Sequence, residues 1–216
     1  MGLILEDGPT HAPLTVVLAH GAGAPMDHPF MEAVATGLAA GGLRVLRVEF
    51  PYMRRRRTEG VRAGPNPLPA LQQTLRLAAA LVPPGELVLA GKSMGGRVAA
   101  TLADALSAQA LVVFGYPLHP AGQRDRLRLD TLQALRTPTL ILQGERDPMG
   151  DRSTWEGLSL PGSVEVAWVP DGEHSLKPRL SSGHTLEGNL SLAVSLAVAA
   201  CTQQRPPRGE PTAPTG

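Results

Sequence analysis

The sequence predicts a doubly wound α/β fold, with a mostly parallel sheet of about six or seven strands flanked by helices. Two observations support this fold class. Short runs rich in Val, Leu and Ile recur without polar alternation, as in parallel strands that are covered on both faces. Between these runs, apolar residues recur at i, i+4 and i+8, as on helices with one buried face.

The apolar runs predict six strands, at residues 14–19, 43–50, 86–90, 110–114, 139–142 and 164–169. Three helical stripes lie between them, formed by Phe30, Val34 and Leu38, by Leu71, Leu75 and Ala79, and by Met94, Val98 and Leu102. A last helix is expected at residues 186–201, with Leu190, Val194 and Val198 on one side. Asp27 is the expected cap of the first helix, and Pro29 suits its opening turn.

The composition favours one globular domain over residues 1–202. Hydrophobic residues make up 43% of the chain and charged residues 18%, which is far from the signature of disorder. Residues 203–216, rich in Pro, Gly and Thr, are expected to be a disordered tail. With 20 basic and 19 acidic residues the net charge is +1, so neither nucleic acid nor an anionic membrane is an expected partner.

Cysteine usage and the first residues indicate a cytoplasmic protein. Cys201 is the single cysteine, which rules out an intramolecular disulfide and a thiolate cluster for structural zinc. The first residues carry no cationic segment typical of a secretory signal. The apolar stretch 191–201 is much shorter than the roughly 20 residues that span a bilayer. No metal or other cofactor is expected.

The segment Gly91-Lys-Ser-Met-Gly95 matches G-x-S-x-G and predicts a nucleophilic serine. A buried strand leads into it and an amphipathic helix leads out, so Ser93 is expected on a sharp, strained turn in which only glycine fits at the flanking positions. The alternative is a serine that merely caps a helix. A phosphate-binding loop fails because Glu86 replaces its first glycine, and a dinucleotide fingerprint fails at Met26.

A nucleophilic serine needs a base and a carboxylate that orients the base. Asp147 follows the predicted strand at 139–142, and His174 follows the strand at 164–169, so both are expected at the carboxyl edge of the sheet with Ser93. Glu145 is the nearest competitor for the carboxylate and His184 for the base. Three further acidic residues, Asp104, Asp125 and Asp130, fall in helical or linking segments that are expected to lie away from that edge.

The small-residue turn after the first strong strand predicts an oxyanion hole, formed by the N–H groups of Ala22 and Met94. Gly21 in the same turn and Tyr116 after another strand are candidate substrate contacts. Tyr116 and His119 either line the cleft or pack at a strand end. His20 is expected to have a structural role, bonded to nearby backbone.

Four consecutive arginines, Arg54 to Arg57, follow the predicted strand at 43–50, with Arg62 nearby. A solvated, self-repelling loop is the preferred interpretation. The alternative is that these arginines, Arg54 first, bind a carboxylate or phosphate of the substrate.

Several segments together resemble the α/β-hydrolase superfamily and, within it, the small dienelactone-hydrolase-like proteins of the KANL/Tex hydrolase-like family. The likeness spans most of residues 14 to 200. The segments are Ala19-His-Gly-Ala-Gly23, Phe50-Pro-Tyr-Met53, Gly91-Lys-Ser-Met-Gly-Gly-Arg97, Gly115-Tyr-Pro-Leu-His-Pro120, Gln143-Gly-Glu-Arg-Asp-Pro148 and His174-Ser-Leu-Lys177. The resemblance implies an α/β-hydrolase fold, an esterase-type site without a cofactor, and Ser93, Asp147 and His174 at the matching motif positions.

The expected function is therefore a serine hydrolase, a carboxylesterase or dienelactone-hydrolase-like enzyme, that cleaves an ester or related acyl bond of a small molecule. The alternative is a binding or scaffold protein that keeps the fold without the chemistry, a role that the resemblance to non-catalytic eukaryotic relatives implies. Only residues 116–137 separate two predicted strands where caps commonly enter, so no large cap is expected. The extra antiparallel strands usual at the superfamily's N-terminus are expected to be missing or shortened.

Overall fold

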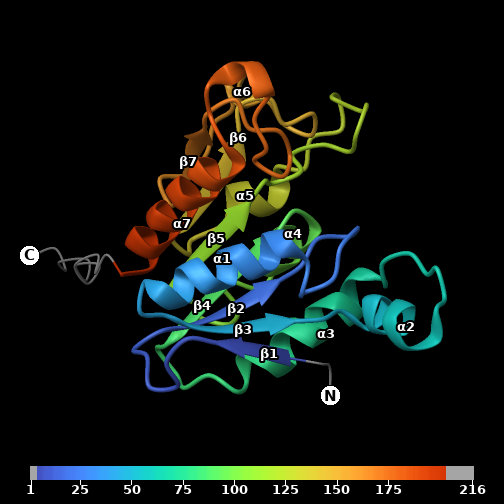
Figure 1. The fold of residues 1–216 in the computed structure, drawn as a ribbon, viewed down its shortest axis with the longest axis vertical. Coiled ribbons are helices and arrows are strands. Elements are labelled where there is room, and N and C mark those ends of the chain that lie inside the picture. Colours follow the sequence, from blue (N-terminus) through green and yellow to red (C-terminus); the bar gives the residue numbers. More distant parts are fainter. Residues whose placement is uncertain (1–3, 203–216) are drawn as a thin grey trace, which may run out of the picture.

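Seven strands form one sheet in the computed structural model of the chain, which describes residues 4–202 (Figure 1). They are β1 (Ile4–Asp7), β2 (Thr15–Ala19), β3 (Arg44–Val48), β4 (Leu87–Lys92), β5 (Ala110–Phe114), β6 (Thr139–Gly144) and β7 (Val164–Val169). Their order in the sheet is β1-β3-β2-β4-β5-β6-β7, and every neighbouring pair is parallel except β1 with β3. The predicted mostly parallel sheet is confirmed, and the expected tail at 203–216 lies outside the described residues.

Strand β1 was not among the six strands predicted from apolar runs. It has only four residues, three of them half-buried, so it carries no continuous apolar signal. It pairs with β3 at the edge of the sheet, where Arg47 binds Asp7 at 2.8 Å and Arg44 binds Glu6 at 2.7 Å. The antiparallel part of the sheet is thus shortened rather than missing.

Helices cover both faces of the sheet (Figure 1). The helical segments are α1 (Pro29–Ala40), α2 (Pro51–Glu59), α3 (Leu68–Ala79), α4 (Met94–Ala100), α5 (Asp130–Ala134), α6 (Arg152–Trp155), the 3₁₀ turn η1 (Leu180–Ser182) and α7 (Leu186–Thr202). One apolar cluster joins α1 and α7 to the sheet, and the other joins α3 and α4 to its opposite face. Successive strand residues such as Val16 and Val17 belong to different clusters, because side chains alternate across a strand. Burial on both faces explains why the strands read as continuous apolar runs.

The cap of α1 differs from the prediction. His28, not Asp27, is the N-cap, and its Nδ1 accepts a hydrogen bond from the Phe30 N–H at 3.2 Å. Asp27 instead accepts two hydrogen bonds of 2.7 Å from the guanidinium of Arg57. The distant arginine offers the carboxylate two charge-assisted bonds, so it competes successfully with the local cap.

The expected arginine loop is wrong, because Arg54 to Arg57 lie on helix α2. Arg55 pairs with Glu59 one turn away, at 3.1 Å. Arg56 donates to the Ala63 carbonyl at 2.7 Å. Arg57 pairs with Asp27, as described for the α1 cap. It also pairs with the buried Glu49, at 2.8 Å. These partners offset the repulsion expected of four like charges, and Tyr52 and Met53 alone are too few to give an apolar stripe.

Helix α7 has nearly the predicted bounds, but its buried side differs. Asn189, Ala193, Ala197 and Cys201 are its buried residues. The predicted stripe faces α1 instead: a Cβ placed on Gly37 would lie 2.7 Å from Val194, and one on Gly41 would lie 2.5 Å from Val198. Small side chains let α7 lie close to the sheet, while its larger valines contact α1 at Gly37 and Gly41.

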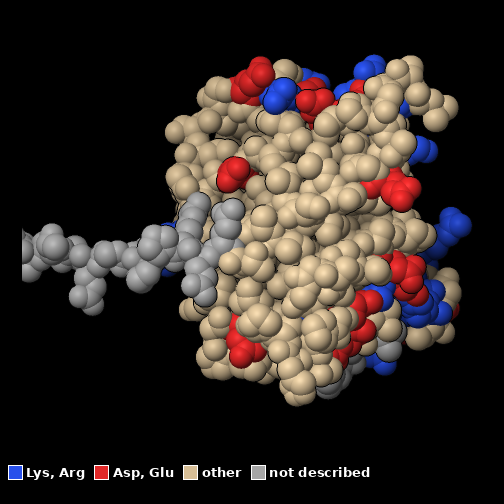
Figure 2. Space-filling model, turned by 60° about the vertical axis from the view of Figure 1, so that its left-hand side comes forward, with Lys and Arg blue, Asp and Glu red and all other residues tan. Residues whose placement is uncertain are grey.

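The segment between β5 and β6 holds only the five-residue helix α5, so no large cap covers the carboxyl edge of the sheet. Within residues 4–202, none of the helices combines the length and the apolar character needed to cross a membrane. The cytoplasmic location and the absence of nucleic-acid partners remain predictions. Figure 2 shows a face on which basic and acidic side chains gather near one another along the edges rather than in a continuous basic stripe.

Candidate active site

Ser93 lies on the sharp turn between β4 and α4, with φ 52° and ψ −114°. This left-handed conformation is strained for a residue that carries a side chain. A Cβ placed on Gly91 would lie 2.4 Å from the carbonyl carbon of Gly95, and one on Gly95 would lie 2.5 Å from the carbonyl oxygen of Ala19. The predicted strain at Ser93 and the predicted need for glycine on both sides are confirmed.

Ser93, His174 and Asp147 form one hydrogen-bonded chain. The distance from His174 Nε2 to Ser93 Oγ is 2.7 Å, and that from His174 Nδ1 to Asp147 Oδ2 is also 2.7 Å. An ionised carboxylate only accepts hydrogen bonds, so Nδ1 is assigned as the donor and Nε2 is left to accept from the serine hydroxyl. The structure therefore brings together the three side chains that the sequence predicted, from loops after β4, β6 and β7.

Asp147 is fully buried and its oxygens are saturated by donors. Besides His174, its Oδ2 accepts from Gln143 Nε2 at 2.9 Å, and its Oδ1 accepts from the Met149 N–H at 2.8 Å. Gln143 also donates to the Gly150 carbonyl at 2.9 Å, and its Oε1 accepts from the Tyr116 N–H at 2.8 Å. Gln143 was not predicted as a site residue. The available signal was an amide side chain near the end of an otherwise apolar buried strand.

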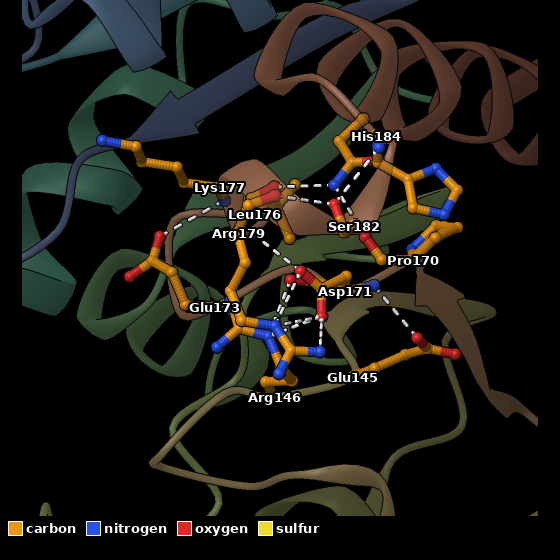
Figure 3. Close-up of polar contacts among 11 residues, drawn as sticks. Glu145, Arg146, Pro170, Asp171, Glu173, Leu176, Lys177, Arg179, Ser182 and His184 are labelled. Carbon is orange, nitrogen blue, oxygen red and sulfur yellow. Dashed lines mark hydrogen bonds and ion pairs between the residues drawn. The ribbon is translucent and has the colours of Figure 1, made fainter.

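Glu145 and His184, the alternative candidates for the carboxylate and the base, occupy other positions. Glu145 accepts from the Asp171 N–H at 3.0 Å and pairs with Arg152 at 3.4 Å, without contacting His174. His184 is exposed beside η1, and its N–H donates to Ser182 Oγ at 3.1 Å (Figure 3). Neither joins the hydrogen-bonded chain of Ser93.

The His174 loop, residues 170–177, is held by charged side chains around Asp171 (Figure 3). Asp171 accepts from the Arg179 N–H at 2.7 Å and from Arg179 Nε at 2.9 Å, and Arg146 Nε lies 2.9 Å from it. Hydrogen bonds from Arg179, with the charge of Arg146, lower the pKa of Asp171 to about 2. Asp171 therefore stays ionised, and the start of the loop stays tied to both arginines, at neutral pH.

Two buried donors fix the rest of the His174 loop. Asn189 on α7 donates to the carbonyls of Pro170 and Leu176, both at 2.9 Å, and so ties the two ends of the loop to one helix. Lys92 at the end of β4 donates to the carbonyl of His174 itself at 2.7 Å. The three contacts act on the backbone that carries the imidazole, so the position of His174 depends on residues far away in sequence.

Lys92 is the residue before Ser93 and is almost fully buried. Its Nζ lies 5.6 Å from the centre of the Phe30 ring. Burial lowers the pKa of the Lys92 ammonium to about 8, although the Asp147 and Glu173 carboxylates oppose this shift. Gly115 makes room for the contact, because a Cβ there would lie 2.8 Å from the His174 carbonyl oxygen.

The turn after β2 presents backbone N–H groups next to Ser93. His20 is buried, with Nδ1 2.6 Å from the Gly21 carbonyl and Nε2 accepting from the Phe50 N–H at 3.1 Å, which confirms its structural role. Tyr52 donates to the Ala22 carbonyl at 3.0 Å. Across residues 4–202, no protein acceptor binds the N–H of Ala22 or of Met94. Both N–H groups thus remain available to a bound group.

A cavity of about 680 Å³ opens beside Ser93; we call it the Ser93 cavity. Its walls are Ala22, Pro65, Asn66, Leu68, Leu71, Met94, Arg97, Val98, Thr101, Tyr116, Pro117, Leu127, Arg128, Asp130, Thr131 and Met149. Ser93 itself is half-buried, so its hydroxyl is reachable. A wider, more apolar groove of about 1300 Å³ between α1 and α7 contains no residue of the hydrogen-bonded chain, and we assign the chemistry to the Ser93 cavity for that reason.

Of the other predicted contacts, only Tyr116 lines this cavity. Tyr116 lines the cavity, and its hydroxyl donates to the Arg128 carbonyl at 2.9 Å. Gly21 is buried against Ser93, and Arg54 is exposed on α2; neither lines the cavity. His119 packs in the interior rather than in the cleft.

The expectation that Asp130 lies away from the site is wrong, because Asp130 is part of the cavity wall. It begins α5, and the loop before this short helix is tied to the segment after β5, because the Arg128 N–H donates to the Leu118 carbonyl at 2.8 Å. Among the residues that the structure describes, no three His, Cys, Asp or Glu side chains are grouped so that they could hold a metal ion.

Comparison with known proteins places this geometry in a family. Residues 12–202 match the model of a family described as an alpha/beta hydrolase domain. An α/β serine hydrolase without a lid from Xanthomonas campestris aligns with a TM-score of 0.62 and 23% identity, over 90% of this chain and 88% of the other. A dienelactone hydrolase from Anabaena variabilis gives 0.63 and 23%, over 90% and 88%. The esterase domain of a Rhodothermus marinus protein gives 0.65 and 18%, over 90% and 89%. At these identities the structural likeness establishes the fold.

Proposed function

The chain belongs to the alpha/beta hydrolase domain family, and we propose that it is a serine hydrolase that cleaves an ester or related acyl bond through an acyl-enzyme. The observation that supports this function best is the 2.7 Å contact of His174 Nε2 with Ser93 Oγ, continued by the 2.7 Å contact of Nδ1 with Asp147. This is the arrangement that turns a weak alcohol into a nucleophile. The similar structures named as esterase and dienelactone hydrolase favour ester bonds as the first substrates to test.

In the first step, Ser93 Oγ attacks the substrate carbonyl carbon while His174 Nε2 takes the hydroxyl proton. Asp147 holds the imidazole in the tautomer that can accept and stabilises the imidazolium. The N–H groups of Ala22 and Met94 donate to the developing oxyanion. Removal of one such donor costs ~2.7 to 4 kcal/mol of transition-state stabilisation in enzymes of this kind.

The tetrahedral intermediate then collapses, the bond to the leaving group breaks, and His174 returns the proton to that group. A water molecule attacks the acyl-enzyme in the second step, with His174 again accepting a proton. Collapse releases the acid and returns the proton to Ser93 Oγ. The rival function is a binding protein without chemistry. It would be favoured if the His174 imidazole lay out of hydrogen-bond reach of Ser93, and the short His174 contacts count against it.

A fluorophosphonate probe tests the proposal on the purified full chain. The wild-type protein is expected to be labelled, whereas Ser93→Ala is expected to resist labelling and to lose several orders of magnitude in ester turnover, leaving residual catalysis on the order of 10³ over water. Ser159→Ala, at an exposed serine, is the matched control and should behave as wild type. Equal labelling of Ser93→Ala, or no labelling of the wild type, would overturn the proposal.

A further inference from the structure

Two arginines contribute to the wall of the Ser93 cavity. Arg97 lies on α4 four residues after Ser93, and its N–H donates to the Ser93 carbonyl at 3.0 Å. Arg128 comes from the loop before α5 and donates to the Pro117 carbonyl at 3.4 Å. Both arginines are half-buried. Two cations from separate elements thus flank the space next to the candidate nucleophile.

These arginines differ from most others in the chain, because no carboxylate oxygen within residues 4–202 lies within 4.0 Å of either guanidinium. Arginines that do pair with Asp or Glu are Arg44, Arg47, Arg55, Arg57, Arg124, Arg136, Arg146, Arg152 and Arg179. Asp130 contributes to the same cavity wall, but it is exposed and stays beyond this distance. The cavity wall therefore carries two arginines, neither paired with a carboxylate of residues 4–202, and one aspartate.

The charges of the two arginines both act on the hydroxyl of Tyr116. Tyr116 is buried in the same cavity wall, and burial raises the pKa of its hydroxyl to about 12 while the charges of Arg97 and Arg128 oppose the rise. Burial, followed by the charge of Arg97, lowers the pKa of Arg128. Like charges brought together in a half-buried place are unfavourable unless an anion joins them.

In the proposed mechanism, the Ser93 cavity receives the acyl side of the substrate. His174 must reach the leaving group to return its proton, and His174 is not part of the cavity wall, whereas both proposed oxyanion donors, Ala22 and Met94, are. A leaving group therefore sits toward His174, outside the cavity. The acyl chain is the part of the substrate that extends past Met94 toward the two arginines.

We propose that the substrate is an ester whose acyl group ends in a carboxylate, and that Arg97 and Arg128 bind this carboxylate in the Ser93 cavity. The inference rests on the proposed serine-hydrolase function and specifies its substrate class. Guanidinium groups match carboxylates geometrically and form charge-assisted hydrogen bonds, which are the strong ones. The carboxylate supplies the partner that no Asp or Glu of residues 4–202 provides to either guanidinium, and the same contacts hold the carbonyl carbon at Ser93.

A matched pair of substrates tests this. The 4-nitrophenyl monoester of adipic acid and 4-nitrophenyl hexanoate differ only in a terminal carboxylate against a methyl group. Wild-type kcat/KM is expected to favour the adipate monoester by roughly 10- to 100-fold, as charge-assisted hydrogen bonds allow. The preference should fall as salt rises, because screening weakens the contact.

Substitutions assign the preference to the two arginines. Arg97→Gln with Arg128→Gln should reduce the ratio of the two kcat/KM values to about one, while Arg128→Lys should retain part of the preference by keeping the charge. Arg126→Gln is the control, since Arg126 is exposed, bonds Gln123 at 2.7 Å and does not contribute to the cavity wall. Fluorophosphonate labelling of Ser93 in each variant shows that the site is folded.

A wild-type ratio near one, or a ratio retained by the double variant, would overturn the substrate class while leaving the serine hydrolase intact. If Ser93 is labelled but neither ester is cleaved, the fluorophosphonate labelling is repeated in the presence of monomethyl adipate or of methyl hexanoate. Labelling that monomethyl adipate slows more than methyl hexanoate supports the anion site, and equal slowing by the two compounds refutes it. Failure of the wild-type protein to be labelled at all would sink the proposed function, and this inference with it.

Discussion

The serine turn and the His174 loop, both needed at one site, are held in place by different means. The turn is held by steric fit, since Gly91 and Gly95 let its backbone pack where no Cβ has room. The His174 loop is held by polar side chains from other elements, among them Asn189 from α7 and Lys92 from β4. The two glycines of the first arrangement lie within five consecutive residues, whereas contacts over 8 to 82 positions of the chain hold the second.

The difference implies different responses to substitution. A close-packed backbone cannot yield to an added atom without moving its neighbours, so changes in the turn should affect stability and activity together. The His174 loop is held by several hydrogen bonds, so each single substitution removes only some of them. Its substitutions should lower turnover in steps, while the sheet stays intact.

The largest effect should come from the turn. Gly95→Ala places a methyl group 2.5 Å from the Ala19 carbonyl oxygen and 2.6 Å from that of His20. Because both neighbours are backbone, we expect a loss of about 1–3 kcal/mol or more in the free energy of unfolding and ester turnover near background. Urea unfolding and kcat/KM measure the two effects. The control is Gly64→Ala, where an added Cβ meets nothing within 4 Å, and equal behaviour of the two variants would contradict the steric argument.

A smaller effect is expected on the loop side, from Asn189→Leu. This change removes the donors to the Pro170 and Leu176 carbonyls and buries a side chain of similar size. Each carbonyl left without a partner costs about 1–3 kcal/mol, and we expect kcat to fall by roughly 10- to 100-fold with little change in KM. Ser191→Ala, exposed on the same helix, should match wild type. An unchanged kcat in Asn189→Leu would show that the loop keeps its position without α7.

The smallest effect on turnover, about tenfold, is expected from Lys92→Met, which removes the donor to the His174 carbonyl. Its clearer signature is in the pH dependence of stability. The folded pKa of Lys92 is about 8 against 10.5 for the free side chain, so between these values the unfolded state binds more protons than the folded state. Stability from this group therefore rises with pH over that range.

Urea unfolding of wild type and Lys92→Met between pH 7 and 10 tests this sign. The free energy of unfolding of the wild type should increase relative to that of the variant as pH rises, since all other titrating groups are common to both. A difference that stays flat or falls would contradict a buried Lys92 with a lowered pKa.

Sequence reasoning located most of the sheet, because strands covered on both faces leave an unbroken apolar signal. It missed β1, whose half-exposed residues lack that signal, and α2, whose four arginines suggested repulsion. The sequence predicted Asp27 as the cap of α1, because a cap is a local interaction. The partner of Asp27 in the structure is Arg57, 30 positions away. The errors share one cause: each depended on a partner that sequence proximity does not reveal.

The site divides in the same way. The order of Ser93, Asp147 and His174 along the chain, each directly after a strand, is local information, since the carboxyl ends of parallel strands necessarily meet at one edge. Other features of the site depend on how distant elements pack. These are the hydrogen bond from Gln143 to Asp147, the hydrogen bonds from Asn189 to both ends of the His174 loop, and the two arginines in the cavity wall. Short motifs report their own backbone geometry, while contacts between elements arise only when the whole chain is folded, and these contacts set the base's position and the charge that the cavity presents.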